Sequence, residues 1–364
     1  MHLLIILGLN AFHADSAAAI IRDGVLIAAA EEERFRRIKH WAGFPSEALN
    51  YCLKQAGIGL DKVDHVAINQ DSRANLLPKI LYTALNRPSP TLLLDRLRVR
   101  QSRKSIPRLI EEALPGQSFR GDFHRVEHHM AHLSSAFHVS PFDEAMVVSV
   151  DGFGDFSSAA WGMGLGTRID VTSRVYFPHS LGIFYQAITQ FIGFPHYGDE
   201  YKVMGLAPYG RPAFLDEMRK IVRLTPDGSF ELDLRYFRHH REKISFQWSE
   251  GSPEFEDLFA VALEELLGRR RMPGDPLEDR HRDLAHSAQK MYEEAFFHIL
   301  LHAQRQTGAT NLTLAGGCAM NSVANGKVRR ATPFQSVYVQ SAAGDAGCPL
   351  QISSLIGCPR QTFF

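Results

Sequence analysis

Residues 128–132 read His-His-Met-Ala-His, and residues 147–152 read Val-Val-Ser-Val-Asp-Gly. In a helix, His128 and His132 lie one turn apart on the same face, whereas His129 points elsewhere. The second stretch predicts a buried strand that ends in the carboxylate of Asp151. Two imidazoles on one helix face and a carboxylate at a strand end can hold a metal ion. The alternative is a pair of ordinary helix histidines beside a capping aspartate.

Two strand–turn–strand units flank these histidines. The first has predicted strands at Leu3–Gly8, Ala17–Ile21 and Val25–Ala29, a polar turn at 10–16 and a hairpin turn at Asp23-Gly24. The second has a strand from Ala145 to Asp151 and a glycine-bearing turn at 152–158 that leads into another strand. An actin-like fold needs such a doubled unit to hold a nucleotide from both sides. The pattern therefore predicts an α/β protein with two actin-like lobes.

The composition is that of an ordinary globular protein. The chain has 364 residues, 45% hydrophobic and 22% charged, which is enough for about two or three domains. Lysine and arginine together number 40, as do aspartate and glutamate, so the net charge gives no indication of nucleic-acid binding. A basic run from Arg96 to Arg108 is interpreted as the solvated face of a helix rather than a binding patch.

Cysteine usage and hydropathy indicate a cytoplasmic protein with no membrane segment. The cysteines, Cys52, Cys318, Cys348 and Cys358, form no close pair, which indicates a reducing compartment and argues against a zinc–thiolate site. Cys318, beside Gly316-Gly317, is interpreted as a small packing residue. The apolar start is short and lacks a positive segment, so it predicts a strand rather than a signal peptide. No stretch approaches the length of a membrane span.

The remaining pattern alternates helices, strands and loops. We expect helices from Ser46, as the cap, to about Ala56, from 180 to about 192, near 254–267, and from Asp283 to about Thr307, with strands at 64–69, 311–315 and 337–339. Residues 70 to about 124 are less regular, and 198–210 is expected to be a structured loop with three glycines.

Three loops carry further candidate residues. Lys39, beside an aromatic residue and a glycine turn, can hold a phosphate or a developing negative charge. The strand that runs into Gly316 and Gly317 lets a nucleotide base or ribose lie against bare backbone. Asp345, flanked by small residues after a strand, can reach into a cleft.

Taken together, these segments resemble the O-carbamoyltransferase family, which includes the nodulation-factor, cephamycin and tobramycin carbamoyltransferases. The resemblance rests on separated motifs from residue 4 to about 347, namely LGLNAFHADSAAAII, EEERFRRIKHW, EHHMAHLSSAF, VVSVDGFGD, DEYKVMGLAPYG, LAGGCAMNSVANG and SAAGDAG. It implies an actin-like ATPase (ribonuclease H-like) fold with mixed sheets flanked by helices. It also implies lobes at 1–144, with an insertion at about 70–124, and at 145–364.

The resemblance further implies a reaction and a set of site residues. Carbamoyl phosphate and ATP give carbamoyl-adenylate, whose carbamoyl group then passes to a hydroxyl of a small-molecule acceptor, as in antibiotic biosynthesis. The implied residues are metal ligands (His128, His132, Asp151 and Asp345, with iron(II) as the expected divalent ion), a proton carrier (His13), a side chain that steadies anionic oxygens (Lys39) and an adenine-nucleotide site (Gly205, Gly316, Gly317 and Asn321).

The C-terminal end departs from the family pattern. Full-length members carry a YrdC-like domain that performs the activation step, and we expect it to be absent here, because the chain stops at Phe364. Where the family continues as a helix of small residues, this chain has Cys348-Pro349-Leu350-Gln351, which predicts a truncated second lobe. A separate YrdC-like activating domain or protein is the implied partner. The rival hypotheses are an inactive or partner-dependent remnant and an actin-like kinase or ATPase.

Overall fold

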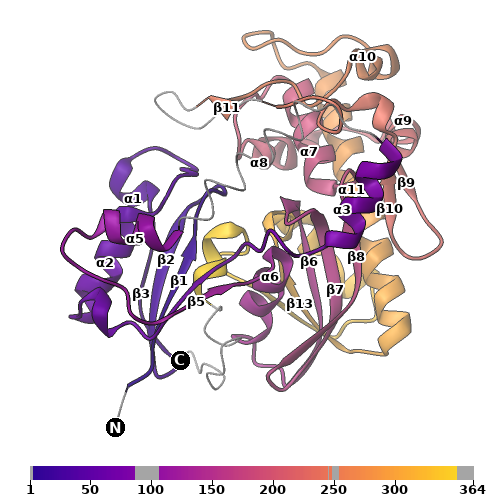
Figure 1. Cartoon of the computed structure of the whole chain (residues 1–364). Helices are drawn as coiled ribbons and strands as arrows, with labels where there is room; N and C mark the ends of the chain where they lie inside the picture. Colours follow the sequence, from indigo (N-terminus) through magenta and orange to yellow (C-terminus); the bar gives the residue numbers. More distant parts are fainter. Residues whose placement is uncertain (1–2, 87–105, 245, 248–253, 351–364) are drawn as a thin grey trace.

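The computed structural model describes residues 3–86, 106–244, 246–247 and 254–350. Its centre is formed by two five-stranded sheets, each with its own helices (Figure 1). The first sheet has the order β3-β2-β1-β4-β5 and the second has the order β14-β13-β6-β7-β8. In each sheet three consecutive strands form an antiparallel meander. Two further strands extend the sheet on the other side of the first meander strand, and all three run parallel to one another.

The strands of the first sheet are β1 (Ile5–Asn10), β2 (Ala17–Arg22), β3 (Val25–Glu31), β4 (His65–Ile68) and β5 (Asp122–Arg125). Those of the second sheet are β6 (Glu144–Gly154), β7 (Ser157–Leu165), β8 (Arg168–Tyr176), β13 (Asn311–Ala315) and β14 (Ser336–Val339). The same topology thus occurs twice, which confirms the predicted actin-like, ribonuclease H-like fold with mixed sheets.

The helices and short strands fill the connections between these strands. Before β6 they are α1 (Glu33–Arg36), α2 (Ser46–Ala56), η1 (Leu60–Lys62), α3 (Leu76–Asn86), α5 (Ile106–Ala113) and α6 (His128–Phe137). Between β8 and β13 they are α7 (Leu181–Phe191), α8 (Glu200–Leu206), η3 (Ala207–Tyr209), α9 (Leu215–Ile221), β9 (Val222–Leu224), β10 (Phe230–Leu232), η4 (Leu234–Tyr236), β11 (Phe246–Gln247), β12 (Glu254–Phe255), α10 (Val261–Leu267) and α11 (Asp279–Thr307). After β13 they are η5 (Gly317–Met320), α12 (Ser322–Asn325), α13 (Val328–Ala331) and η6 (Asp345–Leu350).

Each lobe has its own apolar core. In the first lobe, the buried side chains of β1, β2 and β4 pack against α2 and α5. In the second lobe, β6 and β13 pack against α7 and α11. β1 is buried over its whole length, as expected for an apolar strand with a neighbour on each side.

Two segments cross from one lobe to the other. Helix α6 follows β5 of the first sheet but packs against β6, β7 and β13 of the second (Figure 1). The short helix η6 follows β14 of the second sheet but packs against β1 and β2 of the first, and also against α6. These reciprocal crossings place the start of α6 and the start of η6 together between the sheets.

Several local expectations need correction. Residues 198–210 are not a loop, since they form α8 and η3, and the buried Val203 ties α8 to the core despite the three glycines. The helix expected near 254–267 covers only Val261–Leu267, because 254–255 pairs with β11 and Phe259 bridges to Phe237. The long helix begins at Asp279, where Glu278 and His281 form a reciprocal cap, rather than at Asp283.

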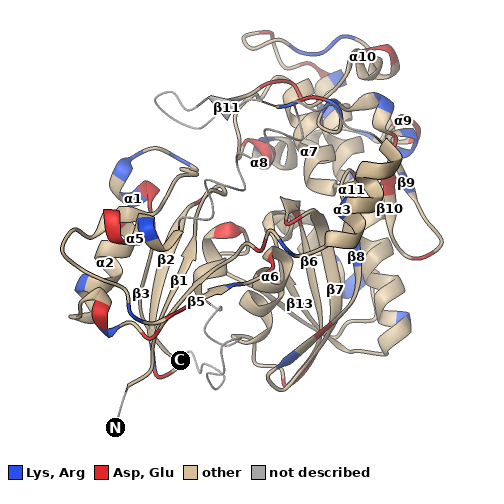
Figure 2. Ribbon diagram, in the orientation of Figure 1, with Lys and Arg blue, Asp and Glu red and all other residues tan. Residues whose placement is uncertain are grey.

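The basic run at 96–108 lies mostly outside the described residues. Its last member, Arg108, is on α5, where it is 79% exposed and pairs with Glu112 one turn away, as on a solvated helix face. In Figure 2, acidic and basic residues alternate along the outer helices and loops. Among the described residues, no helix combines the length and apolarity needed to cross a membrane.

The start of α2 is capped by a residue that sequence analysis did not single out. Ser46 is the first residue of α2 rather than its cap, and its hydroxyl makes no capping bond. Instead, the fully buried carboxylate of Glu32 accepts hydrogen bonds from the backbone N–H groups of Glu47 and Ala48, at 3.2 and 2.8 Å. Glu32 also pairs with Arg36 at 2.8 Å. One carboxylate thus joins β3, α1 and α2.

We predict that Glu32→Ala lowers the free energy of unfolding by about 2–3 kcal/mol, because buried N–H groups lose their acceptor. Urea unfolding followed by circular dichroism measures the change. The matched control is Asn50→Ala, an exposed position on the same helix, which should shift stability by no more than about 0.5 kcal/mol. Equal effects of the two substitutions would contradict this role for Glu32.

Candidate metal centre

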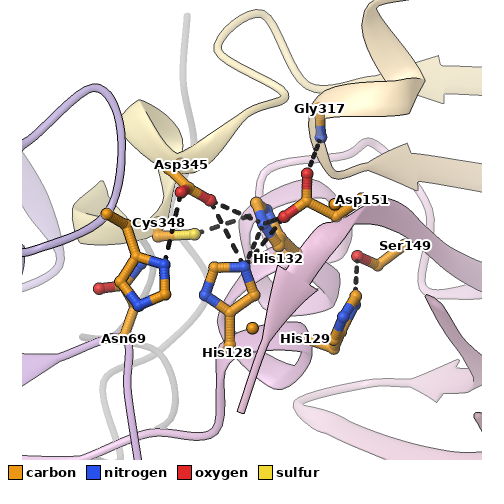
Figure 3. A network of polar contacts seen from close by, with 12 residues as sticks. Asn69, His128, His129, His132, Ser149, Asp151, Gly317, Asp345 and Cys348 are labelled. Carbon is orange, nitrogen blue, oxygen red and sulfur yellow. Dashed lines mark hydrogen bonds and ion pairs between the residues drawn. The ribbon is translucent and has the colours of Figure 1, made fainter. Parts of the chain in front are cut away.

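Four side chains from separate segments converge between the two sheets (Figure 3). His128 and His132 come from α6, Asp151 from β6 and Asp345 from the start of η6. Nε2 of His128 lies 3.1 Å from Asp151 Oδ2 and 3.4 Å from Asp345 Oδ1. Nε2 of His132 lies 3.3 and 3.2 Å from the same two oxygens. The helix spacing predicted for the two histidines thus places both rings on one face, pointing at the carboxylates.

The spacing of these atoms fits the ligand shell of one metal ion. The Nε2 atoms of His128 and His132 face each other at 3.1 Å. Around an ion with bonds of about 2.0–2.2 Å, neighbouring ligand atoms lie roughly 3–3.5 Å apart. One ligand atom from each of the four residues lies within 4.8 Å of the others. The donor set, two imidazoles and two carboxylates, suits a divalent transition metal.

Charge balance gives a second reason why a cation fits. Both histidines are fully buried, and the carboxylates of Asp151 and Asp345 are only 16% and 12% exposed. Burial lowers the pKa of His128, but the negative charge of Asp345 and the hydrogen bond with Asp151 outweigh it and raise that pKa to about 9. Burial raises the pKa of Asp151, yet hydrogen bonds from both histidines hold it well below its usual range. A dication neutralises the two carboxylates while both imidazoles stay neutral.

The metal-binding atoms are oriented by neighbouring groups. Nδ1 of His132 lies 3.5 Å from the buried Cys348 Sγ, and the backbone N–H of Gly317 donates to Asp151 Oδ1 at 2.9 Å (Figure 3). Asp155 accepts the backbone N–H of His128 at 3.0 Å and that of Asp71, from the first lobe, at 2.7 Å. Such outer contacts fix ring and carboxylate orientation in metal sites.

His129 is excluded from the cluster. Its Nδ1 bonds the hydroxyl of Ser149 on β6 at 2.9 Å rather than either carboxylate of the cluster (Figure 3). Burial lowers the pKa of His129 to about 4, so this ring is neutral. Its direction follows from its position one residue after His128 on the helix.

A glycine makes room for one of the imidazoles. A Cβ atom at Gly154 would come within 2.0 Å of the ring of His128. Gly154 is the second glycine of the motif VVSVDGFGD. Any larger residue at this position would collide with the imidazole of His128. The same turn holds Asp155 and Phe156 at positive φ, so the chain turns sharply where it passes α6.

The two predicted catalytic residues lie differently with respect to the cluster. His13, in the turn after β1, has its Nδ1 3.8 Å from Asp345 Oδ2, and its ring stacks on His128 with centroids 4.8 Å apart. Lys39 is exposed on the loop after α1. Among the described residues, no hydrogen bond or ion pair joins Lys39 to the cluster.

The four predicted nucleotide residues all lie in the second lobe, three of them between β13 and α12 and Gly205 on α8. Gly316 has a φ of 90°, and a Cβ there would meet the Val150 carbonyl at 2.2 Å, so only glycine fits. Gly317 contacts Asp151 as described. Gly205 lies on α8 with open space beside it. The side chain of Asn321 caps α12 and exchanges hydrogen bonds with Gln289.

A second group of potential metal ligands was not predicted from the sequence. Asp15, Glu33 and His40 bring potential ligand atoms together, each side chain being half-buried. His40 Nδ1 lies 2.7 Å from Asp15 Oδ1, and Glu33 accepts the backbone N–H of His40 at 3.0 Å. The sequence feature that could have pointed to His40 was its position directly after Lys39 in EEERFRRIKHW. Because that motif is densely charged, it was interpreted as a solvent-exposed segment.

Comparison with known proteins identifies relatives of this chain. The family model described as "Carbamoyltransferase N-terminus" matches residues 5–351. The uncharacterized protein sll1178 of Synechocystis sp. is 37% identical over 94% of this chain and 55% of its own length. The nodulation protein NolNO of Sinorhizobium fredii is 35% identical over 94% of this chain and 46% of its own length. The chain thus spans about half the length of these curated relatives.

A solved structure also resembles the chain. The crystal structure of HypF from T. kodakarensis matches 98% of this chain and 48% of its own, with 12% identity and a TM-score of 0.45.

We predict that protein purified without oxygen and supplied with iron(II) binds about one ion per chain, and that His132→Ala weakens binding at least about hundredfold. Elemental analysis and calorimetric titration measure both quantities. The affinity should also fall as the pH is lowered, because neutral imidazoles are needed for binding.

The matched control is His129→Gln, which removes a buried imidazole from the same helix that contributes no ligand atom to the cluster. This variant should keep the wild-type affinity. Equal losses in the two variants would mean that α6 merely unfolds, and no loss in either would mean that the ion is bound elsewhere.

Proposed function

The chain belongs to the carbamoyltransferase family, whose N-terminal region it matches, and on this premise we propose that it transfers a carbamoyl group from carbamoyl-adenylate to a hydroxyl of a small-molecule acceptor. The observation that carries the proposal is the convergence of His128, His132, Asp151 and Asp345 between two lobes of a chain matched by that family over residues 5–351. An actin-like kinase or ATPase needs no such set of two imidazoles and two carboxylates. Carbamoyl-adenylate is proposed to come from carbamoyl phosphate and ATP.

In this proposal the cluster holds a divalent metal, for which iron(II) is the expected ion. When bound, such an ion supplies Lewis-acid polarisation of a carbonyl or phosphoryl oxygen. The protein's own contribution is to fix the ion. Asp151 is held by the Gly317 N–H, and α6 is held at its start by Asp155 and by the Glu127 side chain, which accepts the Met130 N–H at 2.9 Å. A site held this firmly orients the donor rather than adapting to it.

The donor's nucleotide is proposed to lie against the second lobe, along Gly316 and Gly317. Gly317 adjoins the carboxylate of Asp151, so a nucleotide on this backbone would have its reactive end near the cluster. Gly205 and Asn321 would border the same region, and Lys39, from the first lobe, would steady anionic oxygens across the cleft. The cytoplasm is the proposed compartment.

Activation is proposed to need a second component. Because the chain spans about half of its relatives' length, the step that forms carbamoyl-adenylate is assigned to a YrdC-like domain or a separate protein. The rival hypothesis is an inactive or partner-dependent remnant that keeps the fold without turnover. Supplying carbamoyl-adenylate directly separates the two.

We predict that this chain, loaded with iron(II) and given carbamoyl-adenylate and glycerol, forms glycerol carbamate and AMP, detected by mass spectrometry. Asp151→Asn should lower the rate by more than about hundredfold, because the buried site then lacks one negative charge. The control Asp170→Asn changes an exposed aspartate on β8 that pairs only with the neighbouring Arg168, and it should be neutral.

Two results would count against the proposal. No transfer by wild type from supplied carbamoyl-adenylate, to glycerol or to any other nucleophile, would favour the remnant. ATP hydrolysis that is indifferent to Asp151→Asn would favour the kinase or ATPase.

A further inference from the structure

We propose that His40, held by Asp15, is the group that accepts the proton of the acceptor hydroxyl. The inference rests on the proposed carbamoyl transfer and adds to it the residue that activates the nucleophile. An alcohol attacks a carbonyl carbon slowly unless a base removes its proton. Two histidines border the turn at 12–16, namely His13 and His40, and the structure gives them different surroundings.

His40 and Asp15 form an oriented pair. Nδ1 of His40 lies 2.7 Å from Asp15 Oδ1, so in the neutral ring the proton sits on Nδ1 and the lone pair is on Nε2. A carboxylate that holds Nδ1–H in this way orients the ring and stabilises the imidazolium that forms when Nε2 takes up a proton. The side chains are 27% and 20% exposed, which leaves the pair accessible to a substrate.

The loops that carry the pair are fixed to each other. The backbone N–H of Ser16 bonds the Trp41 carbonyl at 2.9 Å, and that of Phe12 bonds the Gly43 carbonyl at 3.1 Å. Asp15 and His40 themselves have φ values of 55° and 53°. Such left-handed conformations cost free energy in residues other than glycine, and they persist where surrounding contacts enforce them. The hydrogen bond between the two side chains is therefore held in place by the backbone contacts of both loops.

Nε2 of His40 faces the second lobe. The ring of Tyr197 packs edge-on against His40 with centroids 5.1 Å apart, and a Cβ at Gly198 would lie 2.4 Å from Nε2. The turn at 12–16 links this pair to the metal centre. Asp15 bonds His40, and His13, two residues earlier in the same turn, stacks on His128 and lies 3.8 Å from Asp345. The pair and the cluster thus border one region between the lobes.

His13 is placed less suitably for proton transfer. Its ring stacks on His128 and its Nδ1 points at Asp345, which are both members of the cluster. The ring of His13 is therefore already engaged by two residues of the cluster, whereas the carboxylates beside His40, those of Asp15 and Glu33, lie outside the cluster.

Burial lowers the pKa of His40, but the hydrogen bond and charge of Asp15, with the charges of Glu33 and Glu200, outweigh it and raise that pKa. The titratable groups around the ring are Asp15, Glu31, Lys39, Tyr197, Glu33 and Glu200.

In the chemical step, the hydroxyl oxygen of the acceptor forms a bond to the carbamoyl carbon, and its proton passes to Nε2 of His40. The bond between that carbon and the phosphate oxygen of the adenylate breaks, and AMP leaves with the electron pair. The imidazolium, paired with Asp15, then releases the proton to solvent.

The test compares two nucleophiles with carbamoyl-adenylate as donor and iron(II)-loaded protein. Glycerol needs a base, whereas hydroxylamine attacks through an uncharged nitrogen before it loses a proton. We expect His40→Gln to lower transfer to glycerol by about 10²–10⁴-fold and transfer to hydroxylamine by less than about threefold. His13→Gln should affect both nucleophiles alike. The control His65→Gln changes a half-buried histidine at the opposite end of the first sheet and should affect neither.

A pH profile separates proton acceptance from a purely structural role. The base must be neutral to act, so the rate with glycerol should rise with pH through the pKa of His40. Asp15→Asn keeps a hydrogen-bond acceptor but removes the charge that raises this pKa, so the rising limb should move to lower pH. The melting temperature and bound iron of each variant show that fold and metal site are intact.

Three results would overturn the assignment of His40. In His40→Gln they are equal losses with both nucleophiles, or no loss with either. The third is a loss selective for glycerol in His13→Gln instead. Wild-type protein that transfers to neither glycerol nor hydroxylamine would remove the proposed function itself, and the inference with it.

Discussion

The structure depends on the placement of two carboxylates against two imidazoles in a region with little access to water. Asp151 and Asp345 are 16% and 12% exposed, and His128 and His132 are fully buried. Buried charge of one sign is costly unless a compensating charge lies within bonding distance. Either protonated imidazoles or one dication can supply it. A dication would also account for the two ring nitrogens that face each other at 3.1 Å, a separation that repels when both carry protons.

The fold brings these groups together through reciprocal crossings. Helix α6 leaves the first sheet to pack on the second, and η6 leaves the second sheet to pack on the first. The ligands at their starts therefore depend on both lobes, and Asp345 is in place only if η6 docks on β1. Gly8 of β1 illustrates this fit, since a Cβ there would lie 2.0 Å from the Pro349 carbonyl oxygen. Binding of an ion by these four residues would for this reason be coupled to the arrangement of the two lobes.

Much of this arrangement was predictable from the sequence. The contacts that were not predicted depend on tertiary structure. Helical spacing alone placed His128 and His132 on one face, and a strand end presented Asp151. Asp345 was assigned by resemblance only, because contacts across 194 or more residues leave no local periodicity. The Asp15–His40 pair was missed because both residues lie in loops, where the hydrogen bonds between turns at 12–16 and 40–43 decide which side chains meet. The adjacent Lys39, favoured from its charge, is exposed.

The central claim is that one ion is bound by two imidazoles and two carboxylates between the lobes. X-ray absorption spectroscopy of the iron(II)-loaded chain tests it most directly, because imidazole rings give a recognisable outer-shell signal. The account predicts two imidazoles and oxygen ligands at about 2.0–2.2 Å, with one imidazole lost in His132→Ala. A spectrum without imidazole scattering, or one unchanged by His132→Ala, would contradict it.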